Sequence, residues 1–301
     1  MGLTKPFAFM GGPSDEFTFL LDDYGTDAIA ALSVRKLRSD YTGSCLQVTR
    51  ASDSTTQDIG FVDNLLDTSA ISSFCGASEG HVSAWYDQTT GTIYEFARSG
   101  VTNSPFIYDG ANIITSSNGK PTLEFKNLAD NLGTRYLDCD TFGTDYINGK
   151  TNFEFDVYSA LRSPDGATFH QLFRAEGSGG AERFAFTFRA QSFGQKWQIL
   201  TDTGATTVEL QSTALYTDFT EYLMSYNGSG SNGQIFANTT EVASGSLEGG
   251  TYTISEAAIG NDPNGSEPFR GRISEIIFYT VQKTSDRAAI SDNINSYYNI
   301  Y

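Results

Sequence analysis

The second half of the chain repeats one pattern, in which short runs of alternating apolar and polar residues are separated by turns rich in Gly and Asn. Apolar and polar side chains alternate through residues 153–158, and residues 182–191 place three phenylalanines on one face. Such alternation is typical of half-buried strands. Comparable segments occupy residues 196–202, 207–212, 221–228, 233–238, 252–260 and 271–282. Regular short strands joined by these turns predict an all-β fold, either a β-sandwich or a jelly roll.

The first half of the chain mixes helix and strand signals. Residues 28–37 form an apolar run without a clear period, which suits a short helix or a buried strand. Residues 45–61 predict two strands around a turn of Ser, Asp and Thr. A short helix is expected between Asp67, which can cap its beginning, and Gly76, which can end it. A strand follows at residues 81–88, before a turn.

The two ends of the chain have their own signals. Residues 1–25 are predicted to form a short N-terminal arm. Its apolar tip, residues 1–12, would contact a partner chain or lie as an edge strand on its own domain. Residues 26–301 are predicted to form a single domain, because no linker or internal repeat divides them. An amphipathic helix over 284–299, capped by a Thr or Ser at its start, is expected to close this domain.

The net charge narrows the classes of binding partner, and the cysteines bear on disulfides, metal sites and the cellular compartment. A net charge of −17 repels phosphate backbones and anionic lipids, so neither nucleic acid nor a membrane is an expected partner. The number of cysteines is three, and an odd number at these spacings predicts neither a disulfide framework nor a zinc site. No secretory signal and no long apolar span is found, which favours folding in a reducing cytoplasm.

Two segments carry a resemblance to known families. The stretch ALSVRKLRSDYTGSCLQVTRASDSTTQDIGF, followed by VSAWYDQTTG, resembles the opening of the catalytic domain of the fungal α-L-arabinofuranosidase B family, glycoside hydrolase family 54. It is also similar to segments of phage-encoded structural and tail proteins that carry a laminin-G/concanavalin-like sandwich. The ending FRGRISEIIFYTVQKTSDRAAISDNINSYYNIY resembles the last strand and closing helix of laminin-G-like domains. The likeness covers residues 28–91 and 255–301 and implies a concanavalin-like sandwich.

The resemblance implies that the WYDQ segment is a structural corner. Trp85 would point into the sandwich, and Asp87 would accept hydrogen bonds from backbone N–H groups of the turn or pair with an arginine. The alternative is that Trp85, Tyr86 and Asp87 bind a ligand, because exposed aromatic side chains can stack on sugars.

A structural ion pair is also expected near this corner. Arg35, Arg38 and Arg50 lie close together in the sequence, and a buried pair of one of them with Asp87 or Asp58 would be geometrically strict.

The resemblance to a glycosidase raises the question of two catalytic carboxylates. The segment IGNDPNGSEPFRGRISE matches the family's IGGDNSNG…YEG segment and places Asp262 at the position of the general acid. The family's nucleophile is a Glu in an HMEAIYLG-like strand, preceded by two adjacent cysteines. The comparable stretch here has no cysteine pair, and Glu182 stands before its strand. A retaining glycosidase needs both groups, so the pattern favours a protein without hydrolase activity.

A metal site is a further alternative in the same segment. Asp262, Asn264 and Glu267 could supply oxygen ligands to calcium, whereas a plain Asp-Pro-Asn-Gly turn explains the same residues. The histidines have no ligands at zinc spacing, so no other cofactor is expected.

The function that these expectations favour is a structural or adhesion protein of a bacteriophage particle, tail-associated or capsid-decorating. It would be assembled in the host cytoplasm and contact other virion proteins through residues 1–12. It would form a homo-oligomer, with a host-surface glycan as a candidate ligand. The alternative function is a glycoside hydrolase acting on arabinose-containing surface polysaccharide.

Overall fold

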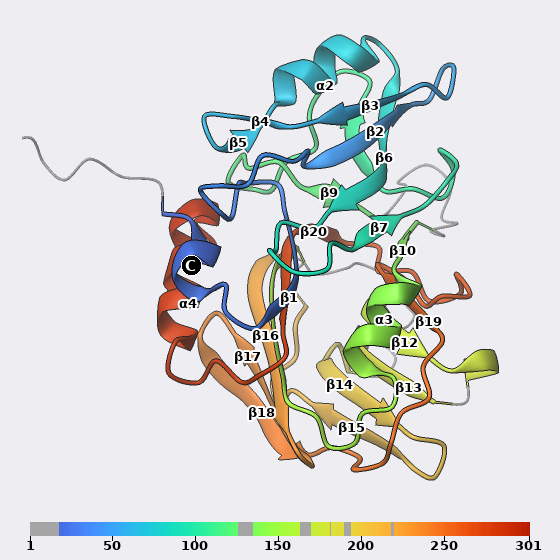
Figure 1. The fold of residues 1–301 in the computed structure, drawn as a ribbon, viewed down its shortest axis with the longest axis vertical. Helices are drawn as coiled ribbons and strands as arrows, with labels where there is room; N and C mark the ends of the chain where they lie inside the picture. Colours follow the sequence, from blue (N-terminus) through green and yellow to red (C-terminus); the bar gives the residue numbers. More distant parts are fainter. Residues whose placement is uncertain (1–17, 126–134, 163–169, 181, 190–193, 218–219) are drawn as a thin grey trace, which may run out of the picture.

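The computed structural model describes residues 18–125, 135–162, 170–180, 182–189, 194–217 and 220–301. These residues build a predominantly antiparallel β-structure with a few short helices, in which two β-layers face each other in the lower half of the view (Figure 1). The predicted all-β sandwich is therefore confirmed. The segment of residues 1–12 that was expected to bind a partner lies outside the described residues.

The first layer joins the two ends of the chain. In order of pairing it contains β18 (Thr240–Ser246), β17 (Asn232–Ala237), β16 (Glu221–Ser229), β11 (Phe155–Arg162), β20 (Arg272–Tyr279) and β1 (Ala28–Ser33). The run 28–37, which suited a helix or a strand, thus begins as a strand on β20. This pairing makes the start of the chain part of the same sheet as its end.

The second layer extends from the sandwich into the upper half of the molecule (Figure 1). Its pairing order is β15 (Thr207–Gln211), β14 (Trp197–Asp202), β13 (Arg183–Phe188), β12 (His170–Glu176), β19 (Glu256–Ile259), β10 (Leu137–Asp138), β7 (Glu95–Ala97), β6 (Glu79–Tyr86), β2 (Leu46–Arg50) and β3 (Thr56–Ile59). β8 (Phe106–Asp109) pairs with β6, and β9 (Leu123–Glu124) connects β8 to β20. A separate hairpin consists of β4 (Phe61–Val62) and β5 (Leu65–Leu66).

Aromatic side chains fill the space between the two layers. The rings of Phe186 and Tyr226 stack with centroids 4.6 Å apart, and those of Phe173 and Phe278 meet edge-on at 5.1 Å. Each pair joins a strand of one layer to a strand of the other, so the alternation seen in the sequence marks the inner face of the sandwich.

Strand β11 differs from the prediction of a half-buried strand. Its polar-face residues Asp156 and Tyr158 are as buried as its apolar ones, each with 0% of its surface exposed. The reason is a second covering layer, because helix α4 (Arg287–Tyr298) packs against β11 and β16. The alternation therefore marked two different interiors rather than a core and solvent.

The helices follow the predictions in part. α2 (Thr68–Cys75) begins at Asp67, whose side chain accepts a hydrogen bond from the N–H of Ala70, and ends at Gly76, as expected. α4 lies where a closing helix was predicted, but it begins after Asp286 and has no side-chain cap, so the expected Thr or Ser cap is wrong.

Two further helices were not foreseen. α1 (Leu20–Tyr24) packs on α4 and buries Leu20 and Leu21, so this part of the predicted arm lies against the domain. α3 (Asp140–Ile147) packs on β19 through Gly143, where a Cβ atom would lie 2.4 Å from the Cβ of Ala257.

The three cysteines, Cys45, Cys75 and Cys139, are buried and form no disulfide with one another. In the described parts of the chain, no helix is long and apolar enough to cross a membrane.

Candidate functional site

The WYDQ segment turns the chain at the end of β6. Trp85 is 0% exposed, and Asp87 is 0% exposed beside it. One carboxylate oxygen of Asp87 accepts the N–H groups of Ala31 and Thr89, each at 2.9 Å, and the other accepts the Thr89 hydroxyl at 2.8 Å. Burial raises the pKa of Asp87, and these hydrogen bonds oppose the rise. Asp87 therefore holds the turn through backbone N–H groups, one of the two expected roles.

Gln88 fastens the same corner to the segment that follows β1. Its side-chain oxygen accepts the N–H of Leu37 at 2.8 Å, and its side-chain nitrogen donates to the carbonyls of Ser33 and Arg35 at 3.2 and 3.0 Å. The two parts of the arabinofuranosidase-like stretch, the segment after β1 and the WYDQ corner, thus bind each other directly. Sequence reasoning named Asp87 but missed this role of Gln88.

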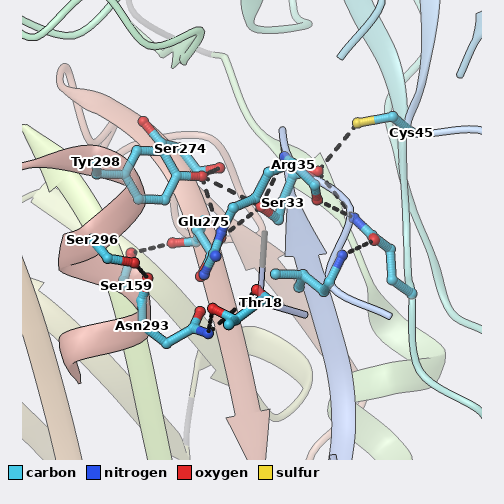
Figure 2. A network of polar contacts seen from close by, with 12 residues as sticks. Thr18, Ser33, Arg35, Cys45, Ser159, Ser274, Glu275, Asn293, Ser296 and Tyr298 are labelled. Carbon is cyan, nitrogen blue, oxygen red and sulfur yellow. Dashed lines mark hydrogen bonds and ion pairs between the residues drawn. The ribbon is translucent and has the colours of Figure 1, made fainter. Parts of the chain in front are cut away.

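Arg35 forms the strict buried ion pair, but with a different partner from those expected. Its Nε and Nη2 atoms donate to the two carboxylate oxygens of Glu275 at 2.9 and 3.0 Å (Figure 2). Ser33 donates to the same carboxylate at 2.6 Å, and the Tyr298 hydroxyl lies 3.3 Å from it. Because β1 pairs with β20 so that Ser33 faces Glu275, the carboxylate comes from the far end of the chain.

The other predicted pairs are also wrong. Both remaining arginines bond to carboxylates close to them in sequence, Arg38 to Asp40 and Arg50 to Asp53. Asp58 accepts a hydrogen bond from the hydroxyl of Tyr86 at 2.9 Å and another from Gln47 at 3.2 Å. Local pairs form at low entropic cost, and Asp58 lies on the exposed face of β3, away from the buried Arg35.

Whether the corner residues can bind a ligand, as expected, depends on how exposed each side chain is. A stacking platform must be open to solvent, and the fully buried Trp85 is not, so that interpretation of Trp85 is wrong. Tyr86 is half-buried, with its hydroxyl bonded to Asp58.

Asp262 lies in the turn that follows β19, and its carboxylate builds that turn. The Ser266 hydroxyl and the N–H of Glu267 each donate to it at 2.9 Å, and the Ser266 N–H donates as well. The side chain of Asn261 accepts the N–H groups of Asp262 and Glu267 at 2.9 and 2.8 Å. Gly260 before the turn has φ +87°, and a Cβ there would lie 2.1 Å from the ring of Phe125. The turn is therefore closely specified by its sequence.

A buried ionic cluster beside this turn was missed by sequence reasoning. Glu176, 0% exposed at the end of β12, accepts the side-chain N–H of Asn264 at 2.6 Å and pairs with Arg174 at 2.5 Å. Arg174 also donates to Glu267 at 3.0 Å. Burial raises the pKa of Glu176, Arg174 opposes this, and the charge of Asp262 adds to the rise. The available signal was the spacing of Arg174 and Glu176, which puts both on one face of a strand.

The three expected calcium ligands serve different partners. Asp262 binds its own turn, the amide of Asn264 donates to Glu176, and Glu267 accepts from Arg174 and from Gln171. Among the residues that the structure describes, no group of three acidic, His or Cys side chains is arranged to hold a metal ion.

Glu182 lies immediately before β13 and has partners outside this cluster. Its carboxylate accepts a hydrogen bond from the backbone N–H of Thr253, and its carbonyl accepts the N–H of Gly177 at 2.9 Å. Glu182 thus joins the ends of β12 and β13 to the segment before β19.

Two family models match the chain. The model described as Concanavalin A-like lectin/glucanases superfamily matches residues 157–289. The fold is a concanavalin-like β-sandwich. The model of the catalytic region of alpha-L-arabinofuranosidase B matches residues 20–114, which include β1 and the strands β2 to β8 of the upper half of the molecule. No curated protein sequence matches the chain.

Solved structures share the sandwich over almost the whole chain. A GH54 α-L-arabinofuranosidase soaked with a cyclic sulfate inhibitor is 17% identical, with a TM-score of 0.64 over 93% of this chain and 66% of that one. An arabinofuranosidase complexed with arabinofuranosyl-alpha-1,2-xylobiose is also 17% identical, with a TM-score of 0.64 over 93% and 65%. The chain thus spans just under two thirds of these proteins, and the likeness establishes the fold alone.

Proposed function

We propose that this chain is a non-enzymatic structural or adhesion protein of a bacteriophage particle, tail-associated or capsid-decorating, that binds host-surface carbohydrate. The concanavalin-like sandwich supports the carbohydrate part, because this superfamily model describes lectins as well as glucanases. The particle part rests on the sequence resemblance to phage structural proteins. Contacts with other virion proteins through residues 1–12 and a homo-oligomeric state belong to the same proposal.

The observation that carries the non-enzymatic part is the state of Asp262. A retaining glycosidase needs two carboxyl groups about 5 Å apart that can both reach the substrate. Asp262 is 3% exposed, and both of its oxygens accept hydrogen bonds from its own turn. The carboxylate of Glu182 is bound to the backbone of Thr253. Both candidate groups are thus occupied as parts of the scaffold.

Activity and location can be tested together. Purified protein and its Asp262→Asn variant are incubated with 4-nitrophenyl α-L-arabinofuranoside and with polysaccharide from the host envelope, and released sugar is measured. We expect neither protein to release sugar, and we expect mass spectrometry to find the chain in purified virions. Turnover by the natural chain that is lost in the variant would overturn the non-enzymatic proposal. Absence from virions would overturn the particle assignment.

A glycoside hydrolase is the second candidate, and one observation favours it. Glu176 is a buried carboxyl group near Asp262 with a raised pKa, which is the condition of a general acid. In that case Glu176→Gln and Asp262→Asn would each lower kcat by about 10²-fold or more, with unchanged circular dichroism. The pairing of Glu176 with Arg174 argues against this candidate, because the guanidinium opposes the rise in the pKa of Glu176 and occupies its carboxylate.

A further inference from the structure

A cavity lies where β10 ends and α3 begins, whereas Asp262 lies in the turn after β19. It has a volume of about 480 Å³ and lies between the segment that leads into β7 and the first turn of α3. Small-molecule sites in proteins have volumes of about 300–1,000 Å³. We call this cavity the β7–α3 groove. Its lining includes Ile93, Tyr94, Glu95, Asp138, Asp140 and Phe142.

The buried side of the groove is packed and hydrogen-bonded. The rings of Tyr94 and Phe142 meet edge-on at 5.3 Å, and the two residues are 6% and 1% exposed. The Tyr94 hydroxyl donates to Asp145 at 3.0 Å, and its N–H donates to Asp87 of the WYDQ corner at 3.4 Å. The corner thus fixes the loop that forms one wall. A preformed wall lowers the entropic cost of binding a small ligand.

The lining combines apolar and acidic groups. Ile93 is 56% exposed at the groove, which gives an apolar surface open to solvent beside the exposed carboxylate of Glu95. Asp138 is held by Arg98 at 2.7 Å, and Asp140 accepts the N–H of Ala257 at 2.9 Å. These carboxylates are oriented by fixed partners and retain further oxygen lone pairs for hydroxyl donors.

We propose that the β7–α3 groove binds a neutral, hydroxyl-rich saccharide. Its carboxylates would accept hydrogen bonds from sugar hydroxyls, and Ile93 would pack against a C–H face of the ring. The choice of a sugar as ligand rests on the proposed carbohydrate-binding function, whereas the location and the charge preference rest on the groove.

The charge of the lining decides between sugar classes. Glu95, Asp138 and Asp140 are acidic, and the nearby Arg98 is engaged by Asp138. With a chain charge of −17, sialylated or sulfated sugars would be repelled. A chelated cation is not favoured, because the described residues contain no converging set of three acidic, His or Cys ligands.

Two variants probe the groove without disturbing the core. The double variant Glu95→Gln/Asp138→Asn keeps the shape and weakens the acceptors. Thr92→Trp fills the groove from an exposed lining position. The matched control is Glu241→Gln, an exposed carboxylate on β18 in the other layer.

Binding is measured on an array that carries neutral, sialylated, sulfated and amino-sugar-terminated oligosaccharides, and each hit is titrated in solution. We expect neutral glycans to bind, both groove variants to weaken binding at least tenfold, and the control to match the natural chain. Hydrogen exchange should slow at residues 92–97 and 138–142 when the glycan is added.

The outcomes separate the two proposals. Neutral-glycan binding that survives both groove variants would overturn the groove as the site and leave the proposed function intact. A preference for anionic or amino sugars would overturn the ligand class. Failure of every glycan to bind would overturn the groove and the carbohydrate-binding function together.

Discussion

At the scale of single residues, Asp156 has the most unusual environment. It is 0% exposed on β11, and one of its carboxylate oxygens accepts the N–H of Lys283 at 3.0 Å. Burial raises the pKa of Asp156 to about 7, although this hydrogen bond and the charge of Arg287 oppose the rise. A carboxyl group in such a place takes up a proton within the physiological range.

Asp156 is expected to make stability depend on pH. The folded state holds the proton more tightly than the unfolded chain, whose Asp pKa is about 3.9. Its stabilisation is therefore complete below pH 4 and is lost as the pH rises through about 7. We predict that the free energy of unfolding of Asp156→Asn, relative to the natural chain, grows by a few kcal/mol between pH 4 and 8. Urea unfolding at several pH values measures this, with the exposed Asp40→Asn as control; a pH-independent difference would contradict it.

Trp85 offers a second test at this scale. A fully buried Trp leaves a large cavity when truncated, so Trp85→Ala should lower the free energy of unfolding by about 3–5 kcal/mol. Tyr86→Phe removes only the hydrogen bond to Asp58 and should cost about 0.5–1.5 kcal/mol. The melting temperatures of the two variants, measured by thermal unfolding, compare how much each of these neighbouring residues contributes to stability. A melting temperature for Trp85→Ala equal to that of the natural chain would show that the corner is not structural.

At the scale of elements, the beginning of α2 shows how local signals fix a helix. Asp67 precedes the first turn, and its side chain accepts the N–H of Ala70 at 2.9 Å. This bond satisfies one of the N–H groups that a helix leaves without a partner at its start. The helix therefore begins where the sequence places this side chain.

Removal of the cap should destabilise this element measurably. We expect Asp67→Ala to cost about 0.5–2 kcal/mol, whereas Ser69→Ala, at an exposed position within the same turn, should change stability by less than about 0.5 kcal/mol. Urea unfolding of the two variants measures the difference. Equal stabilities would mean that tertiary packing alone positions α2.

At the scale of the whole molecule, strand pairing and a buried ion pair join the regions of the two family matches. β1, from the region matched at residues 20–114, pairs with β20 of the region matched at 157–289, and the buried Arg35–Glu275 pair joins the segment after β1 to β20. Gln88 then ties the upper strands to this junction. The regions share one core, so they are expected to unfold together.

The two tryptophans report on this directly, because Trp85 lies in the first matched region and Trp197 in the second. Trp197→Phe leaves only Trp85 as a fluorescent reporter, and Trp85→Phe leaves only Trp197. We predict that the fluorescence of each variant shows one unfolding transition in urea, and that adding Glu275→Ala lowers the midpoint of both transitions. Loss of one partner of a buried ion pair costs about 3–5 kcal/mol. The control Arg35→Met/Glu275→Leu should recover much of this loss. If Glu275→Ala shifted the midpoint of only one region, the shared core would be refuted.

The sequence by itself determined the strands, the α2 cap and the aromatic inner face, because period-two alternation and capping are local properties. It also located the turn at Asp262 and the corner at Asp87, whose partners lie mostly within a few residues. It could not supply partners from distant segments. Glu275 for Arg35, Glu176 for Asn264, and the meeting of Tyr94 with Asp138 in one groove depend on strand pairing. The burial of both faces of β11 likewise required α4 to fold back. Only the tertiary structure decided these, because one strand's pattern records that a face is covered but not which element covers it.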